Sequence, residues 1–107
     1  MMRQWIALSL AAVLWAGGVA LAQNLPGDVI EGQRFAEEIC VECHAVGKGD
    51  YGVSLQGAPA FQEIADDPAV TSLSLRVFLR TPHEVMPDFI LSETETDDVI
   101  AYILSMK

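Results

Sequence analysis

The feature that most constrains this chain is the stretch "EICVECHA" at residues 38–45, which holds both of its cysteines and one of its two histidines. Two residues separate Cys40 from Cys43, and His44 follows the second thiol directly. Two thiols and an imidazole at this spacing bind a metal, exchange disulfides or anchor a prosthetic group. Each use requires a different fold around it, so the rest of the chain decides between them.

Residues 1–22 are predicted to be an export signal. The segment from Trp5 to Ala22 contains no charged residue, follows a start bearing only Arg3, and ends in the small-x-small pattern Ala-Leu-Ala that signal peptidase accepts. Its length is at the lower limit for crossing a bilayer, so a retained membrane anchor is the alternative. In either case we expect residues 23–107 to form one exported, periplasmic domain.

The exported domain is strongly acidic. Without Arg3 it holds five basic against fifteen acidic residues, a formal charge of −10. Nucleic-acid binding is therefore excluded, because it requires clustered Lys and Arg to neutralise phosphates. A field of this sign steers a protein toward basic surfaces, although the same charge also serves solubility alone.

Periodicity and capping signals predict an all-α domain. The predicted helices run from about Asp28 to Glu42, Ala60 to Ala65, Ser72 to Arg80, and from Ser92 toward the end of the chain. Residues 45–58 contain four glycines and have no helical period, so we expect an ordered loop there.

The apolar positions predict which helix faces are buried. Ile30, Phe35 and Ile39 form one side of the first helix, whereas the third helix has no clean polar face and is expected to be buried on two sides. The closing helix carries a stripe of Val99, Ile100, Ile103 and Leu104, with Tyr102 beside it and Met106 as packing. Only six aromatic residues remain in residues 23–107, so a further means of stabilising this small core is expected.

Two uses of the cysteine motif are disfavoured by this context. Disulfide exchange places such a motif at a helix start after a strand, whereas here it ends a helix in a chain without predicted strands. A zinc site needs four ligands, yet only His83 remains as a nitrogen donor, and the adjacent Cys43 and His44 are poorly placed to share one ion.

Covalent haem fits the motif. Two thiols at this spacing reach the two vinyl groups of one porphyrin as thioethers, and the following imidazole becomes the proximal iron ligand. Met86, before Pro87 in "RTPHEVMPDF", is the predicted sixth ligand, which raises the reduction potential. The alternatives are that Met86 fills the core, that His83 ligates instead, or that the sixth position is open in a ligand-binding or peroxidatic protein.

Several segments together resemble class I cytochromes c of the small bacterial monohaem type over residues 24–107. They are Gly32 before Phe35-Ala36, "CVECH" at 40–44, "GAPAF" at 57–61, "TPHEVMP" at 81–87 and the terminal "DDVIAYILSMK". The resemblance implies the cytochrome c fold, with first and last helices crossing beside one covalently bound haem. It also implies that Gly32 and Ala36 approach Tyr102 and Ile103, and that the Pro59 carbonyl accepts the Nδ1 proton of His44.

The resemblance implies an exported carrier of single electrons between redox partners, and nothing in the chain suggests an enzyme. A haem subunit stably bound to a periplasmic dehydrogenase or oxidase is the alternative. The lysine ring of mitochondrial members is absent here, so we expect the partner's docking surface to be basic. Candidates to contact the haem propionates are Lys48, Arg76, Arg80 and Tyr51.

Overall fold

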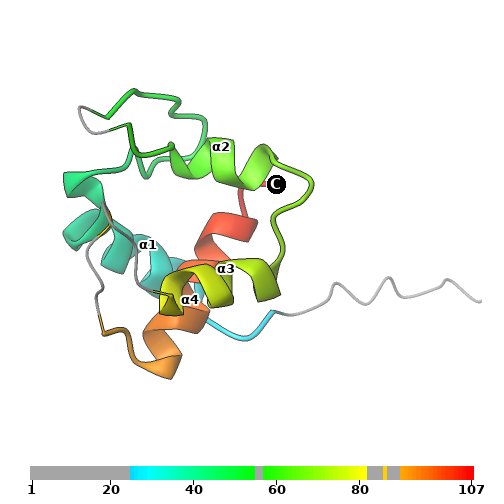
Figure 1. Cartoon of the computed structure of the whole chain (residues 1–107). Helices are drawn as coiled ribbons and strands as arrows, with labels where there is room; N and C mark the ends of the chain where they lie inside the picture. The colour runs from blue at the N-terminus through cyan, green and yellow to red at the C-terminus, as the bar shows by residue number, and fades with distance from the viewer. Residues whose placement is uncertain (1–24, 55–56, 82–85, 87–89) are drawn as a thin grey trace, which may run out of the picture.

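The computed structural model describes residues 25–54, 57–81, 86 and 90–107. These residues form the helices α1 (Val29–Glu38), α2 (Phe61–Asp66), α3 (Ser72–Arg80) and α4 (Glu93–Leu104), with a 3-10 turn η1 (Cys40–Glu42) and no strand (Figure 1). The predicted all-α class is confirmed. The predicted export signal lies outside the described residues, among which no helix is long and apolar enough to cross a membrane.

Helix α4 is the centre of the domain. Each of the three other α-helices packs on it, and α1 makes the largest of these contacts. Its N-cap is Ser92, where the sequence predicted the capping box: the Ser92 hydroxyl accepts from the Glu95 N–H at 3.1 Å, and the Glu95 carboxylate accepts from the Ser92 N–H at 2.8 Å. Its predicted stripe is confirmed as core, since Val99, Ile100 and Ile103 are buried, and Met106 joins them.

Helix α1 reaches α4 through a glycine. A Cβ on Gly32 would lie 1.9 Å from the Asp98 carbonyl oxygen and 2.8 Å from the Tyr102 Cβ, so no larger residue fits without movement. The predicted close approach of Gly32 to Tyr102 is therefore confirmed. The Asp98 carboxylate adds a polar link, because it accepts from the backbone N–H of Asp28 at 2.7 Å, directly before α1.

Two predicted helix boundaries need correction. Helix α1 ends at Glu38 rather than Glu42, because the chain tightens into η1 and the N–H groups of Cys43 and His44 both donate to the Cys40 carbonyl, at 3.1 and 2.9 Å. Helix α2 is shifted by one residue, since Ala60 is extended and donates its N–H to the Glu63 carboxylate at 3.0 Å. The bounds of α3 are as predicted.

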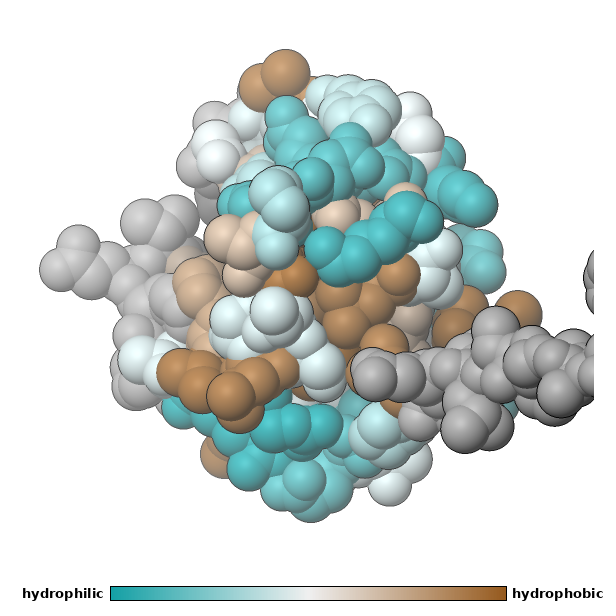
Figure 2. Space-filling model, turned by 90° about the vertical axis from the view of Figure 1, so that its right-hand side faces the viewer, coloured by the Kyte–Doolittle hydropathy of each residue, from teal (hydrophilic) through white to brown (hydrophobic). Residues whose placement is uncertain are grey.

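Two burial predictions were wrong. Ile30 is 69% exposed, and α1 buries its small residues Gly32 and Ala36 instead, because close helix contact leaves room for little else. Helix α3 is not buried on two sides: Leu73 and Val77 are 71% and 58% exposed, since among the described helices α3 packs on α4 alone. Figure 2 shows apolar side chains lying among hydrophilic ones on one face of the molecule.

Candidate functional site

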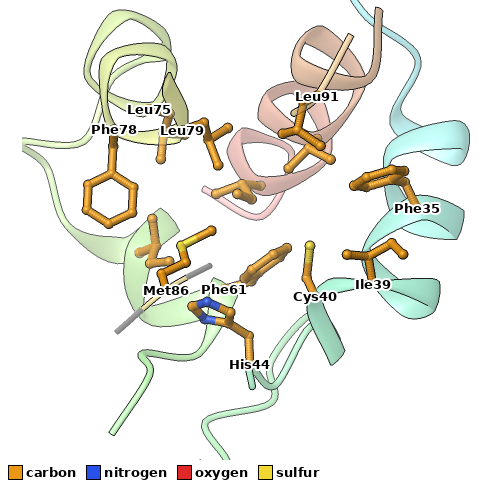
Figure 3. Close-up of a pocket in the computed structure, with 13 residues that line it drawn as sticks. Phe35, Ile39, Cys40, His44, Phe61, Leu75, Phe78, Leu79, Met86 and Leu91 are labelled. Carbon is orange, nitrogen blue, oxygen red and sulfur yellow. The ribbon is translucent and has the colours of Figure 1, made fainter. Parts of the chain in front are cut away.

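The described helices enclose one apolar cavity with an empty volume of about 680 Å³, counted to its open mouth (Figure 3). The residues that line it are Phe35, Ile39, Cys40, His44, Phe61, Ile64, Leu75, Phe78, Leu79, Met86, Leu91, Val99 and Ile103. Three of them carry donor atoms for a metal or a covalent bond, namely Cys40, His44 and Met86, and the others are hydrocarbon.

The turn η1, directly after α1, places Cys40 at the cavity. The side chain is half-buried, and burial raises the pKa of the Cys40 thiol to about 11. This thiol is therefore neutral at physiological pH, as an apolar cavity requires. Cys43 is also half-buried and not disulfide-bonded, but it is not part of the lining, although its N–H and that of His44 share the Cys40 carbonyl.

The segment before α2 holds the His44 imidazole by a hydrogen bond at Nδ1. Its Nδ1 lies 2.6 Å from the Pro59 carbonyl oxygen, the hydrogen bond that the sequence predicted. A carbonyl can only accept, so Nδ1 carries a proton, and in the neutral imidazole Nε2 then keeps its lone pair. The Phe61 ring packs against the imidazole with 5.3 Å between centroids. The ring is thereby fixed with its donor nitrogen available.

Met86 is the third residue with a donor atom in the cavity. Figure 3 shows the Cys40 sulfur, the His44 imidazole and the Met86 side chain turned toward one cavity. The other histidine considered as a ligand, His83, lies outside the described residues. Within the described part of the chain, no three His, Cys, Asp or Glu side chains gather into a metal site.

These residues fit a haem. An apolar cavity lined by hydrocarbon suits a porphyrin, a thiol at its edge suits thioether formation, and an imidazole with a free nitrogen plus a thioether are ligands that iron takes in haem proteins.

Comparison with known proteins decides the family. The model of the cytochrome c family matches residues 29–107. The chain belongs to the cytochrome c family. It is 39% identical over 83 residues to cytochrome c-552 of Bradyrhizobium diazoefficiens, an alignment covering 78% of this chain and 79% of that protein. No solved structure matches it significantly. As a class I monohaem cytochrome c, it binds one covalently attached haem c and carries electrons.

Three of the four groups predicted to contact propionates have other partners in this cytochrome c. Arg76 pairs with Asp97 and, at 3.5 Å, with Glu93, while Arg80 also pairs with Glu93. Tyr51 donates its hydroxyl proton to Asp66. The arginines join α3 to α4 because the acidic first turn of α4 lies beside them.

Sequence reasoning missed the buried polar residues Gln62, Thr96 and Asp98. Gln62 and Asp98 have partners far away along the chain, so no local pattern marks them, whereas Thr96 donates to the Ser92 carbonyl four residues before it. Gln62 hydrogen-bonds to Met106, and Asp98 to Asp28.

Proposed function

We propose that this cytochrome c ligates its iron through His44 and Met86, with Cys40 and Cys43 as the thioether attachment points. The observation that supports it best is that His44 and Met86 line the same apolar cavity as Cys40. The bound haem supplies the redox chemistry, with iron alternating between the ferrous and ferric states. No substrate chemistry is assigned to the chain, which we propose is not an enzyme.

The chain's own residues then have defined tasks. Pro59 holds the proton on Nδ1 of His44, which orients the ring and strengthens Nε2 as a donor. Met86 supplies a neutral thioether, a ligand that raises the potential. The hydrocarbon lining excludes water, and a dry site favours the lower charge of ferrous iron.

We further propose that the protein is exported and exchanges single electrons with partners whose docking surface is basic. Support comes from the apolar segment 5–22 and from the five basic against fifteen acidic residues of 23–107. Electron exchange with a cationic reagent should therefore slow as salt rises, whereas exchange with an anionic reagent should accelerate. Co-purification with a large oxidoreductase through a salt wash would instead favour the bound-subunit alternative.

The ligand set is tested by the visible spectrum of the reduced holoprotein with and without carbon monoxide. We expect no change for the native protein, because both axial positions are filled. Met86→Ala should shift the Soret band on adding the gas, whereas Met106→Ala, a matched control at the other methionine of residues 23–107, should not. A shift in the native protein would reject Met86 as a ligand.

A further inference from the structure

Gln62 is a buried polar side chain beside the cavity but outside its lining. It is 6% exposed, and its amide makes three hydrogen bonds. The oxygen accepts from the Gly49 N–H at 2.8 Å, and the nitrogen donates to the Met106 carbonyl at 2.9 Å and to the Asp66 carboxylate at 2.8 Å. The first turn of α2 is thereby tied both to the loop after the cysteine motif and to the end of the chain.

The three residues before Gln62 hold the imidazole. The Pro59 carbonyl bonds to Nδ1 of His44 at 2.6 Å, and the Phe61 N–H donates to the Ala45 carbonyl at 2.9 Å. The Phe61 ring also packs on the His44 ring. Residues 59–61 therefore clamp His44 and Ala45 through two backbone groups, the Pro59 carbonyl and the Phe61 N–H, and through the Phe61 ring. The position of residues 59–61 sets the orientation of the imidazole.

This clamp depends on anchors outside itself. Helix α2 has only six residues, too few to be stable without tertiary contacts. Pro59 has no N–H to donate, and the Ala60 N–H is bound within the same turn by Glu63. The amide of Gln62 supplies the side-chain hydrogen bonds that fix this turn to two distant segments.

We propose that Gln62 is a positioning residue for the proximal ligand: it tunes the reduction potential by holding the Pro59 carbonyl on His44. The proposal rests on the proposed function, in which His44 binds the iron. A strong bond at Nδ1 makes the imidazole a stronger donor, which favours ferric iron and lowers the potential. Weakening it raises the potential. General loosening that admits water acts in the opposite direction, because water stabilises the higher charge of ferric iron.

The test uses Gln62→Leu holoprotein, with two readouts. Solvent exchange of the His44 Nδ1 proton, followed by proton NMR, should become on the order of tenfold faster, because the bond to Pro59 opens more often. The midpoint potential should rise. Gln62→Met keeps nearly the length of the side chain and adds no charge but loses the hydrogen bonds to Gly49, Met106 and Asp66, so it should give a change of the same sign. This second variant also serves if Gln62→Leu does not fold.

Two controls separate positioning from packing. Gln33→Leu makes the same substitution on α1, where the side chain donates to Glu37 at 3.0 Å, and should leave both readouts unchanged. Ser92→Ala removes the cap of α4 and lowers stability without touching α2. Unchanged exchange and potential in folded Gln62→Leu, a fall in potential, or an equal rise in Ser92→Ala would each overturn the inference. Absence of iron-bound histidine signals in the native protein would instead overturn the proposed function.

Discussion

Helices α1 and α2 both pack on α4, but they are held there in different ways. At the α1 contact the decisive residue has no side chain, since Gly32 lies directly against the Asp98 carbonyl. At the α2 contact the decisive residue is the buried amide of Gln62, which hydrogen-bonds to the Met106 carbonyl at the end of α4. The first contact depends on shape and tolerates no added atom, whereas the second depends on polar partners and tolerates small shifts.

The largest expected effect is at the α1 contact. Gly32→Ala adds a methyl group where the neighbouring backbone carbonyl cannot move, so we expect a loss of about 3 kcal/mol in the free energy of unfolding, or no folding. Gly47→Ala is the matched control, because its Cβ would meet only Asp50, at 3.6 Å, and should change stability by less than about 0.5 kcal/mol. Thermal unfolding of the two holoprotein variants measures these changes in stability. If Gly32→Ala and Gly47→Ala lost the same stability, the α1 contact would not depend on shape.

A second prediction tests whether polar groups matter at the α1 contact too. Asp98→Ala leaves the backbone N–H of Asp28 without its acceptor, at a cost of about 1 to 2 kcal/mol. Asp98→Asn keeps an oxygen in place and should cost less. Denaturant unfolding of both variants measures the difference. If the two lose equal stability, the hydrogen bond to Asp28 contributes nothing and shape alone holds α1.

The smallest effect is expected on the α2 side, at the surface. The hydrogen bond from Tyr51, followed by that from Gln62, lowers the pKa of Asp66. A lowered pKa in the folded state stabilises the protein above the ordinary pKa of the group, and this contribution is lost as the pH falls through the lowered value. Tyr51→Phe should raise the pKa of Asp66.

The pH dependence checks the Tyr51 prediction. The variant should be slightly less stable than the native protein at neutral pH, and the two should converge as acid protonates Asp66. Carboxyl NMR titration and unfolding curves between neutral pH and about pH 2 measure these changes. A stability difference that persists unchanged into acid would mean that Tyr51 acts through packing alone.

Whether a feature depends on local or on distant residues explains what could be predicted from the sequence. Capping residues predicted Ser92 at the start of α4, and the cysteine motif pointed to Cys40 and His44, which line the cavity, because both signals are local. The exposure of Leu73 and the burial of Gln62 could not be predicted, because each depends on which distant segments lie beside it. The roles of Cys40, Cys43, His44 and Met86 toward haem stay predictions.

The hydrogen bond from Asp28 to Asp98 joins residues 70 positions apart, at the first and the last helix. Closing so long a loop is slow, because the chain loses conformational entropy before the contact between its ends can stabilise it. A growing chain that still lacks α4 also lacks the surface on which α1, α2 and α3 pack. Folding therefore waits for the final helix, and we expect the thiols of Cys40 and Cys43 to stay accessible to solvent until it forms.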